Sequence, residues 1–472
     1  MAERYDLVIL GAGPGGYVAA VRAGQLGLRT AIVEKRGAPG GTCLHWGCVP
    51  TKVMLHAAGL MEEARGAAAF GVELGAPALD LAKLHKRKAV TIKRLAKAIE
   101  NLLDARGVER VHGRGRLDGP GRVLVECDGG PRTLAAERVL LATGSAIAWP
   151  EGFAPDGERV LHSDHALSLA AVPGEAVVLG AGAIGLEFAS ILRGFGARVT
   201  LVELLDRIAP TEDAELSEAL RYILVRKGIR IHTGARLAPP AAGPDGRLAM
   251  SLQAGGEETP LAADVLLVAT GRRPVTEGIG LETVGLETGP GGFLPVGPRQ
   301  ETAADGVWAI GDMVPGPQLA HLASAEGLVA VEHMAGHDPR PLDRDQCPAC
   351  IYCHPELASV GLTEQAARER GLAVETAVFP LAANSKASLM NAGQGMVKLV
   401  AEAGGGRLLG AHALGAGATE LIAEGGLAVQ AGLDAAAVGR AIHGHPTLSE
   451  AWMEAAHALA GLSIHLPSEK KG

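Results

Sequence analysis

The sequence has 472 residues, more than one hydrophobic core ordinarily holds, so we expect two to four domains. Hydrophobic residues make up 47% of the chain, charged residues 20% and aromatic residues only 3%, and the formal net charge is −8. This balance is typical of a globular protein, and it argues against a nucleic-acid partner and against an anionic-membrane surface.

The beginning of the chain and its six cysteines bear on the compartment. The N-terminus, MAERYDLVIL, lacks the pattern of a signal peptide, and no apolar run reaches the length of a membrane span. We therefore expect a cytoplasmic protein with no membrane partner. In a reducing cytosol, six cysteines indicate catalytic, metal-bound or inert thiols and not a disulfide framework.

The first predicted elements form a βαβ pattern. Residues 5–10, YDLVIL, predict a short buried strand, and GAGPGG follows with Gly11, Gly13 and Gly16 in G-x-G-x-x-G spacing. An alanine-rich helical pattern comes next, and RTAIVE predicts a second strand that ends at Glu34. Such glycines let the backbone approach a pyrophosphate at a helix N-terminus, and the acid can accept hydrogen bonds from ribose hydroxyls. One copy of this fingerprint is a weak signal.

A cysteine pair follows in GGTCLHWGCVPTK, residues 40–52. Cys43 and Cys48 enclose His45, but C-x-H-x-x-C is not a regular zinc or iron–sulfur spacing, so we expect no metal. A structural bridge closing so small a loop would stabilise the protein little. A catalytic disulfide fits better, because the pair follows the fingerprint and precedes a helical pattern. A helix N-terminus and the nearby Lys52 both favour a thiolate.

The same fingerprint recurs at residues 176–203. AVVLGAGAIG carries Gly180, Gly182 and Gly185, a helical pattern follows, and ARVTLVE ends at Glu203. The acid lies at the same distance from the first glycine as in the first copy. Two copies predict two dinucleotides bound by two separate domains, and neighbouring nucleotides suggest electron transfer between a flavin and a nicotinamide.

The second copy favours NAD over NADP. Glu203 would repel a 2′-phosphate, which requires Arg or Lys at that position. Arg207 lies nearby and weakens this argument without reversing it.

Each fingerprint has a buried run downstream that ends in a Thr-Gly turn. VLLATGS ends at such a turn with Gly144, and VLLVATGRRP does so with Gly271. We expect each run to return the chain to the sheet of its fingerprint. VWAIGDMV supplies a further strand followed by Asp312, so the chain between about 151 and 275 is predicted to be inserted into the first domain.

Together these motifs resemble the flavin-dependent pyridine nucleotide–disulfide oxidoreductases. The cysteine motif, both fingerprints, AIGDMV and HGHPTLSEAWMEA occur in the family's order and cover nearly the whole chain. GRRPVTEGIGLE, QLAHLASAEG, FPLAANSKA and GMVKLV strengthen the likeness to members that oxidise dihydrolipoyl groups. Chains similar to mercuric reductase end in a cysteine pair, those similar to glutathione reductase prefer NADPH, and those similar to soluble transhydrogenase lack the first cysteine.

The resemblance implies an α/β fold with two Rossmann-like dinucleotide-binding domains and a C-terminal α+β dimerisation domain. An FAD domain would occupy residues 1–150 and be completed by 276–345. An NAD domain would occupy 151–275, and the dimerisation domain 346–472. The family arrangement also implies an obligate homodimer, in which the C-terminal domain closes over the partner's active site.

The implied cofactors are FAD, tightly bound with one per subunit, and NAD. Lys52 would lie near flavin N5 and pair with Glu187 of GLEFAS, where the alternative is a surface ion pair of little energetic weight. The positions that match the family's FAD contacts are Gly11, Gly13, Gly16, Glu34, Thr42, Lys52, Gly115, Thr143, Gly144, Asp312 and His321. Those that match its NAD contacts are Gly180, Gly182, Gly185, Glu203 and Gly271.

The resemblance assigns the catalytic steps to four residues besides Lys52 and Glu187. Cys48 would be the thiolate next to the flavin, and Cys43 the interchange thiol that forms a mixed disulfide with substrate. His445 would take the proton of a dihydrolipoyl thiol, and Glu450 would orient its ring. The alternative for His445 is a structural histidine, since HPTLSE suits a helix N-terminus.

The implied activity is the oxidation of protein-bound dihydrolipoyl groups, with electrons passing through the disulfide and FAD to NAD+. The partner would be the lipoyl domain of a 2-oxo acid dehydrogenase acyltransferase or the carrier protein of a glycine-cleavage system. The alternative is another NAD(P)H-dependent disulfide reductase, or a complex-docked subunit with altered disulfide chemistry. Turnover of free dihydrolipoamide separates the enzyme from the docked subunit.

The sequence departs from the family at three positions. His45 and Trp46 stand where many members carry Asn and an aliphatic residue, although both sulfurs of the motif are kept. Gly444 stands before the predicted base, where alanine is usual.

The remaining cysteines are expected to be inert. CPACIYC places Cys347, Cys350 and Cys353 in a spacing that superficially suggests a metal cluster. Residues three apart on a strand point to opposite faces, and these positions match ordinary interface-strand residues of the family. We therefore expect small apolar packing there, and an inert thiol at Cys127.

Overall fold

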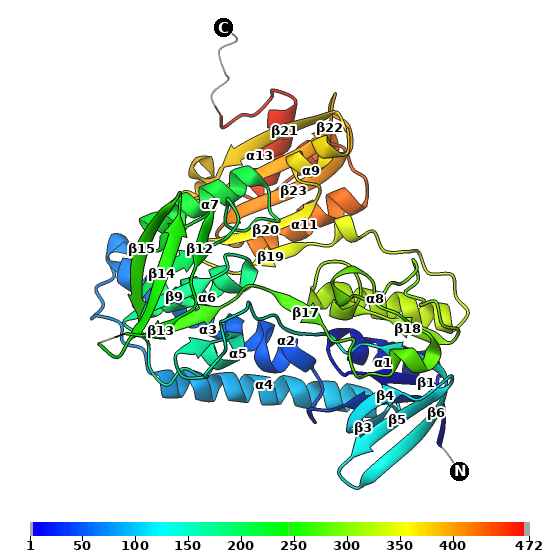
Figure 1. The fold of residues 1–472 in the computed structure, drawn as a ribbon. Coiled ribbons are helices and arrows are strands. Elements are labelled where there is room, and N and C mark those ends of the chain that lie inside the picture. The colour runs from blue at the N-terminus through cyan, green and yellow to red at the C-terminus, as the bar shows by residue number, and fades with distance from the viewer. Residues whose placement is uncertain (1–2, 244, 467–472) are drawn as a thin grey trace. The chain divides into compact units, whose positions relative to one another are not determined.

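A computed structural model describes residues 3–243 and 245–466 (Figure 1). The chain forms two compact units, each made of three stretches. The first unit contains Met1–Val53, Ala82–Ala148 and Gly271–Arg344, and the second contains Met54–Leu81, Trp149–Thr270 and Asp345–Gly472. The four expected domain ranges stay a prediction, and their outermost residues, 1–2 and 467–472, lie outside the described residues. No helix in the described part of the chain is both long enough and apolar enough to cross a membrane.

The first unit is built on a seven-stranded sheet in the order β3-β2-β1-β6-β5-β4, with β18 paired to β6. Strands β1, β2, β3, β6 and β18 pair in parallel, and β4, β5 and β6 pair antiparallel. Leu7, Val8 and Ile9 of β1 are fully buried, as expected for a central parallel strand covered on both faces. The strands are β1 Glu3–Leu10, β2 Thr30–Glu34, β3 Glu109–His112, β4 Arg114–Leu117, β5 Arg122–Cys127, β6 Gly130–Leu141 and β18 Val307–Ala309.

Helices α1 and α8 pack together over this sheet, and the first cysteine-bearing helix follows β2. VLLATGS supplies the end of β6 and VWA forms β18, so both predicted returns to the first sheet are present. The helices of this unit are α1 Pro14–Gln25, α2 Gly41–Trp46, α4 Leu81–Asp104 and α8 Ala320–Met334, with short 3-10 turns at η2 Leu281–Val284, η3 Pro290–Gly292 and η4 Gly311–Met313. A further 3-10 turn, η5 Arg344–Gln346, begins at the last residue of this unit and continues into the second. Helix α3, Cys48–Gly66, begins in the first unit and continues into the second.

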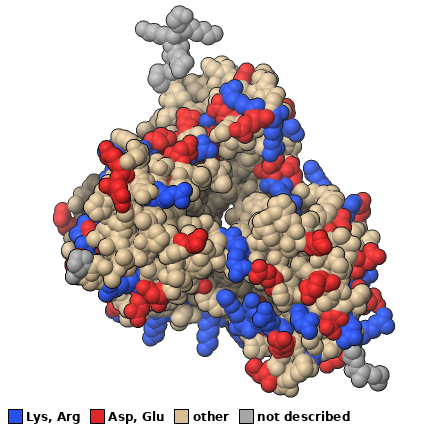
Figure 2. Space-filling view, viewed as in Figure 1, with Lys and Arg blue, Asp and Glu red and all other residues tan. Residues whose placement is uncertain are grey.

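The solvent face of α4 is strongly basic (Figure 2). Blue side chains gather along the lower edge of Figure 2, where Figure 1 draws this helix. The exposed basic residues of α4 are Lys83, Lys86, Arg87, Lys93, Arg94 and Lys97. The negative net charge of the whole chain therefore conceals a local positive surface.

The second unit contains a five-stranded parallel sheet in the order β11-β10-β9-β16-β8. It repeats the centre of the first sheet, since the fingerprint strand β9 lies between β10 and the returning strand β16. Its elements are β8 Val160–Leu161, α5 Ser163–Ala166, β9 Glu175–Leu179, α6 Ala183–Phe195, β10 Arg198–Val202, α7 Ala214–Arg226, β11 Arg230–His232 and β16 Val265–Val268. A small antiparallel sheet is formed by β12 Ala235–Leu237, β13 Ala241–Ala242, β14 Leu248–Ala254 and β15 Glu257–Ala263.

The C-terminal part of the second unit is an antiparallel sheet in the order β19-β20-β23-β22-β21. Helices α11 and α13 pack on it around the fully buried Trp452. Its strands are β19 Ala349–Ile351, β20 Glu356–Gly361, β21 Val374–Pro380, β22 Met396–Glu402 and β23 Leu408–Gly415. Its helices are α9 Glu364–Glu369, η6 Leu381–Ala383, α10 Ser385–Leu389, α11 Ala418–Gln430, α12 Ala435–Arg440 and α13 Glu450–Leu459, and η1 Ala67–Phe70 also belongs to this unit.

The chain leaves and re-enters the first unit through a two-stranded antiparallel ribbon. Strand β7, Ser145–Ile147, pairs with β17, Arg272–Pro274. The chain thus contains a mixed sheet with a parallel core and a fully parallel sheet, each with its own fingerprint, and a C-terminal antiparallel sheet with helices. The predicted α/β class with two Rossmann-like parts and a C-terminal α+β part is confirmed.

Candidate active site

The first fingerprint makes a turn that only glycine permits. Gly11 has φ of 107°, and a Cβ built there would lie 2.3 Å from the carbonyl oxygen of Ala142. A Cβ at Gly16 would lie 1.9 Å from the carbonyl oxygen of Gly11, so helix α1 packs directly on the end of β1. Gly13 is the N-cap of α1 and carries no capping side chain, which leaves the helix N-terminal amides available to an anion.

The second fingerprint repeats this geometry closely. Gly180 has φ of 101°, and its Cβ would lie 2.5 Å from the carbonyl oxygen of Ala269. A Cβ at Gly185 would lie 1.8 Å from the carbonyl oxygen of Gly180. Gly182 is the uncapped N-cap of α6, and a Cβ there would meet open space. Both turns therefore present a glycine-lined approach to a helix N-terminus, which is the donor set that a pyrophosphate requires.

The two predicted ribose acids are held in the same way. Glu34 accepts hydrogen bonds from the amides of Ala12 (3.0 Å) and Arg36 (2.9 Å), one on each carboxylate oxygen. Each carboxylate oxygen keeps a second lone pair, so both can still accept from a hydroxyl.

Glu203 has the same two bonds, from the amides of Ala181 (2.6 Å) and Leu205 (2.9 Å), and it follows directly after β10. Only 8% of Glu203 is exposed, so the amides fix its carboxylate at the turn. Arg207, the nearby cation, donates to the carbonyl oxygen of Pro210 (3.0 Å) and to the Gln365 side chain (3.4 Å). Its guanidinium therefore already has partners within the protein.

The predicted flavin residue Asp312 lies in η4 and is held by a short relay. Ser145 Oγ donates to Asp312 Oδ2, Arg272 Nε donates to Ser145 Oγ (2.7 Å), and a second Arg272 nitrogen donates to the Ser145 carbonyl oxygen (2.8 Å). Ser145 and Arg272 were not predicted as site residues. Each directly or closely follows a Thr-Gly turn, which is the only sequence signal that could have indicated them.

The other predicted flavin residues are distributed over the first unit. Thr143 Oγ donates to the carbonyl oxygen of Val275 (2.6 Å), and Gly144 has φ of 72°. Gly115 lies in β4, and a Cβ there would lie 2.7 Å from Leu10, so its small size also serves packing. Thr42 lies in α2 and His321 is an exposed residue near the start of α8.

The cysteine pair spans the junction of two helices. Cys43 lies in α2, and Cys48 is the first residue of α3. Neither is joined in a disulfide in this structure. A hydrogen bond with the Cys48 side chain, together with burial, raises the pKa of Cys43 strongly. Cys48 is the first residue of α3, where the positive end of the helix favours a thiolate.

The cysteine segment lies against the first fingerprint. A Cβ at Gly41 would lie 2.6 Å from Cα of Gly13, so the start of α2 touches the turn itself. The two departures from the family are satisfied locally: His45 Nε2 donates to the carbonyl oxygen of Pro39 (3.0 Å), and the Trp46 ring lies under the Arg36 guanidinium. Helix α2, which carries Cys43, therefore begins against the first nucleotide turn.

The predicted base His445 is paired with its predicted partner. His445 Nδ1 lies 2.9 Å from Glu450 Oε1, and the amide of Thr447 donates to Glu450 Oε2 at 2.8 Å. Burial alone would raise the pKa of Glu450, but the Thr447 bond, the His445 bond and the charges of His445 and His443 outweigh it and lower that pKa. The His445 side chain is 67% exposed, so Nε2 is accessible.

The expected Lys52–Glu187 pair stays a prediction. Lys52 lies in the first turns of α3. Glu187 lies in α6, is only 5% exposed and accepts from the amide of Tyr352 at 3.1 Å.

The three late cysteines do not form a metal site within residues 3–243 and 245–466, where no group of three or more potential ligands is found. Cys353 is fully buried, and burial, with the charges of Glu187 and Glu356, raises the pKa of its thiol. Cys350 packs against the apolar core of the antiparallel sheet. The positions of Cys350 and Cys353 support the predicted packing role.

Comparison with known proteins places the chain in a family. Residues 5–327 match the family model described as pyridine nucleotide-disulphide oxidoreductase, and residues 347–456 match the dimerisation domain of that family. The dihydrolipoyl dehydrogenase of Bacillus subtilis is 42% identical over 98% of this chain and 100% of its own. Dihydrolipoyl dehydrogenase 3 of Pseudomonas aeruginosa is 43% identical, with coverage of 98% and 100%. The crystal structure of LpdA from Mycobacterium tuberculosis matches with a TM-score of 0.89 at 29% identity, covering 97% of this chain and all of that one.

The two family models match in the order of the fold, one over both fingerprints and the cysteine pair, the other over the antiparallel sheet. The chain therefore belongs to the pyridine nucleotide-disulphide oxidoreductase family.

Proposed function

We propose that the protein is an NAD-dependent flavoenzyme that oxidises dihydrolipoyl groups. The observation that carries this proposal is its identity of 38–43% with curated dihydrolipoyl dehydrogenases over nearly the whole chain. A cysteine pair supports it: Cys43 lies in α2, whose first residue Gly41 contacts the first nucleotide turn, and Cys48 opens α3. The enzyme uses FAD and NAD, and it is a homodimer.

The two turns fit the two cofactors. Both helix N-termini lack a capping side chain, and both acids have lone pairs available for ribose hydroxyls. In the proposed arrangement Gly11, Gly13, Gly16 and Glu34 hold the ADP half of FAD, and Thr42, Gly115, Thr143, Gly144, Asp312 and His321 line the rest. Gly180, Gly182, Gly185, Glu203 and Gly271 hold NAD. When bound, FAD accepts an electron pair from the protein dithiol and supplies a hydride to NAD+.

The sulfur chemistry begins with proton removal. His445 Nε2 takes the proton of one dihydrolipoyl thiol, and the thiolate attacks Cys43 Sγ. The Cys43–Cys48 bond breaks, and Cys48 leaves as a thiolate. The second lipoyl sulfur then attacks the first, which releases Cys43, and its proton passes to Cys43. The substrate loses two electrons and two protons; the electrons remain in the protein dithiol, one proton on Cys43 and one on His445.

The base offsets an unfavourable ionisation. A thiol with a pKa of about 8.5 is only a few per cent thiolate at neutral pH, a deficit of roughly 2 kcal/mol. Glu450 holds Nδ1 of His445, so Nε2 faces outward to accept the proton, and the carboxylate stabilises the imidazolium that forms. The pairing of two further charges, Lys52 and Glu187, is proposed to stabilise the reduced site.

The exposure of His445 supports a site completed by a second subunit. Two thirds of this side chain is exposed in the isolated chain, although its ring is oriented by Glu450. We infer that the partner subunit supplies Cys43 to the same site. The reducing partner is inferred to be the lipoyl domain of a 2-oxo acid dehydrogenase complex or a glycine-cleavage carrier, in the cytoplasm.

A substrate panel tests this proposal. Purified protein is assayed with dihydrolipoamide, glutathione disulfide and mercuric ion, each with NAD(H) and NADP(H). The proposal expects turnover of free dihydrolipoamide with NAD+ far above every other combination. Faster reduction of glutathione disulfide, or no turnover of free dihydrolipoamide by FAD-loaded protein, would favour a different disulfide reductase or a docked subunit.

A further inference from the structure

The loop of residues 352–355, between β19 and β20, contacts two helices of the second unit. On one side, the amide of Tyr352 donates to Glu187 (3.1 Å) and the amide of His354 donates to Ser190 Oγ (3.3 Å), so the loop is bonded to α6. On the other side, His354 Nε2 lies 3.1 Å from the carbonyl oxygen of Leu55 in α3. A carbonyl oxygen only accepts, so Nε2 carries the proton and donates it.

The surface of α3 is shaped to receive this ring. Leu55 and Gly59 are one helical turn apart, and the imidazole lies over that turn. A Cβ at Gly59 would lie 3.1 Å from His354 Nε2 and 3.3 Å from Cε1. Glycine in mid-helix is destabilising relative to alanine. The His354 ring lies where the methyl group of an alanine would be, which explains why residue 59 is glycine.

The loop itself is firmly supported. Strand β20 pairs antiparallel with β23 over its full length. Glu356, its first residue, accepts from the amide and the hydroxyl of Thr419 at 3.0 and 2.8 Å. Cys353 is fully buried and its thiol lies 3.1 Å from the carbonyl oxygen of Pro355. The contact with α3 is therefore made from a rigid base in the antiparallel sheet.

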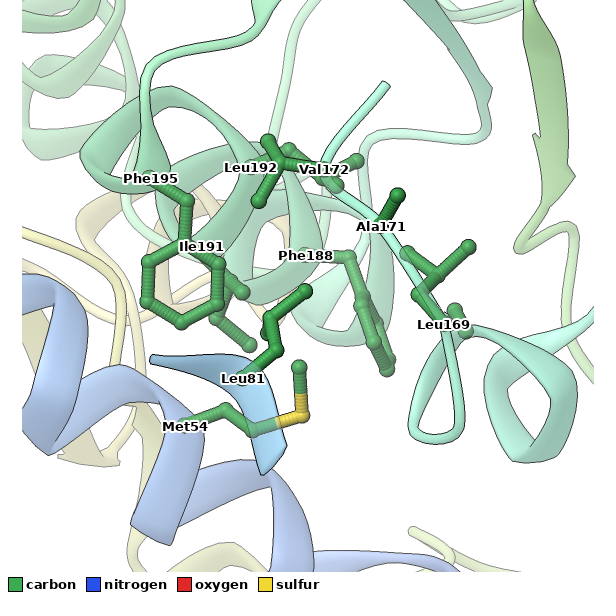
Figure 3. Close-up of a pocket in the computed structure, with 10 residues that line it drawn as sticks. Met54, Leu81, Leu169, Ala171, Val172, Phe188, Ile191, Leu192 and Phe195 are labelled. Carbon is green, nitrogen blue, oxygen red and sulfur yellow. The ribbon is translucent and has the colours of Figure 1, made fainter. Parts of the chain in front are cut away.

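A second contact holds α3 from the side of α6 (Figure 3). Met54 of α3 points toward Leu81, Phe188 and Ile191 around an apolar space of about 10 Å³. A space of this size with only apolar walls is too small and too dry to be a ligand site. A Cβ at Gly194 would lie 2.7 Å from that of Ala58, so the two helices pack closely.

We propose that His354 is a positioning residue for the Cys43–Cys48 dithiol. Helix α3 is continuous from Cys48 to Gly66, and Leu55 lies about two turns from its start. A hydrogen bond to the Leu55 carbonyl oxygen, combined with the packing on α6, fixes the rotation and axial position of the helix. Cys48 sits at its first position, where the thiolate depends on the orientation of the N-terminal amides. The antiparallel sheet of each subunit thereby sets the ionisation of that subunit's own redox dithiol.

Three replacements of His354 isolate the hydrogen bond. His354→Gln keeps an N–H donor at nearly the position of Nε2, whereas His354→Asn has the same amide on a shorter side chain that does not reach Leu55. His354→Ala removes the ring altogether. Each variant is purified with FAD bound and reduced, and the pH dependence of iodoacetamide alkylation is followed at Cys43 and Cys48 by peptide mass spectrometry.

We expect the variants that lack a hydrogen-bond donor to Leu55 to lose thiolate, and the variant that keeps this donor to retain it. His354→Ala and His354→Asn should alkylate roughly 3- to 10-fold more slowly below neutral pH, because the thiolate forms at higher pH, and His354→Gln should stay within about twofold of the parent. If all three variants melt at lower temperature but share the parent's alkylation profile, His354 is only structural and the proposal is wrong. A loss of alkylation rate in His354→Gln equal to that in His354→Ala would also overturn the proposal.

Gly59 provides an independent check on the same contact. Gly59→Ala should shift the ring in the parent and lower the thiolate-dependent alkylation rate, yet in the His354→Ala background it should add no further loss and should raise the melting temperature. Equal effects of Gly59→Ala in both backgrounds would contradict the contact. This guards against a His354 variant that fails to fold.

The inference rests on the proposed function only through the role given to the dithiol. Turnover of dihydrolipoamide by the parent protein is therefore measured alongside alkylation. A parent that does not oxidise dihydrolipoamide but shows the His354 pattern in alkylation would refute the proposed substrate and keep the positioning role. Normal turnover of dihydrolipoamide by the parent, with the same alkylation profile in the His354 variants as in the parent, would keep the proposed substrate and refute the positioning role.

Discussion

The two ring nitrogens of His445 have different surroundings. Nδ1 is bonded to Glu450, whose other oxygen is held by the amide of Thr447, while the side chain as a whole is 67% exposed. The lowered pKa of Glu450 keeps its carboxylate charged well below neutral pH. His443, two residues earlier, is instead 6% exposed and bonded to Glu424, so the neighbouring histidine is structural. The residue that remains available as a base is His445.

His445→Gln should remove the base and leave the rest of the protein intact. General bases typically contribute about 10²–10⁴-fold, so a loss of dihydrolipoamide oxidation in that range is expected. Oxidation of NADH by an artificial acceptor should change little, because that path involves no thiol deprotonation. Glu450→Ala is the comparison and should lose less, since Glu450 orients the ring and stabilises the imidazolium but does not itself take the proton. An equal loss in both assays would contradict the role of base.

A second single residue, Glu203, is expected to set the preference for NAD over NADP. Two amides fix its carboxylate, and Arg207 is bonded to Pro210 and Gln365. Glu203→Ser should narrow the preference for NAD over NADP, because the charge that repels a 2′-phosphate is gone. The ratio of kcat/KM for the two nucleotides measures this. The isosteric Glu203→Gln controls for shape, and a ratio near one in the unmodified enzyme would show the argument to be wrong.

At the scale of elements, each fingerprint couples a strand, a turn and a helix through contacts with no room for a side chain. The second turn offers a matched pair of substitutions. A Cβ at Gly185 would collide with the Gly180 carbonyl oxygen at 1.8 Å, whereas a Cβ at Gly182 meets no protein atom within 4 Å. At Gly185 the protein itself leaves no room for a side chain. At Gly182 only a ligand bound in the space before α6 would meet a side chain.

Gly185→Ala should displace α6 from β9 and lower the melting temperature, while Gly182→Ala should melt like the parent. Both should weaken NAD+ binding, but only Gly182→Ala should do so without a change in stability. Calorimetric melting and NAD+ titration separate the two, and bound FAD is the control because the first fingerprint is untouched. Normal NAD+ affinity in Gly182→Ala would place the nucleotide elsewhere.

The sequence predicted the elements whose formation depends on residues close together in the chain. The fingerprints, the buried strands and the helix after the cysteines are fixed by neighbours within a few residues, although α3 begins at Cys48 itself and β10 ends one residue before Glu203. The relay from Arg272 through Ser145 to Asp312, and the contact of His354 with α3, join segments far apart in the chain. Such contacts leave no periodicity in the sequence, so only the fold revealed them.

At the scale of the whole molecule, a buried ion cluster ties helix α7 to the C-terminal sheet within the second unit. Lys398 Nζ lies 3.1 Å from Asp213, 3.1 Å from Glu215 and 2.8 Å from Glu364, and the side chains of Lys398 and Asp213 are each 3% exposed. Burial acts to lower the pKa of Lys398, but its carboxylate partners prevail and raise it to about 12. Burial acts to raise the pKa of Asp213, but His412 and Lys398 prevail and lower it.

Lys398→Met should leave Asp213 buried without its cation and cost about 3–5 kcal/mol at neutral pH. The lowered pKa of Asp213 means that its stabilisation is present above its unfolded pKa and is lost as pH falls through the folded value. The raised pKa of Lys398 means that its part is lost only as pH rises through about 12. The gap between parent and variant in thermal unfolding should therefore shrink in acid.

Arg368→Met is the matched control, because its ion pair with Glu364 is 59% exposed on the arginine side. It should change stability by less than about 1 kcal/mol. If Lys398→Met lowers stability no more than Arg368→Met does, the buried cluster is contradicted. The same holds if the loss of stability in Lys398→Met is equal at neutral and acid pH.

The most direct test of the account follows the sulfurs through one turnover. Oxidised, FAD-loaded protein is mixed anaerobically with one equivalent of dihydrolipoamide, quenched with iodoacetamide and analysed by peptide mass spectrometry. The account predicts that carbamidomethyl groups appear on Cys43 or Cys48, that Cys127, Cys347, Cys350 and Cys353 label the same with and without substrate, and that a long-wavelength absorption band develops. Unchanged labelling of Cys43 and Cys48, or substrate-dependent labelling at the other four cysteines, would contradict it.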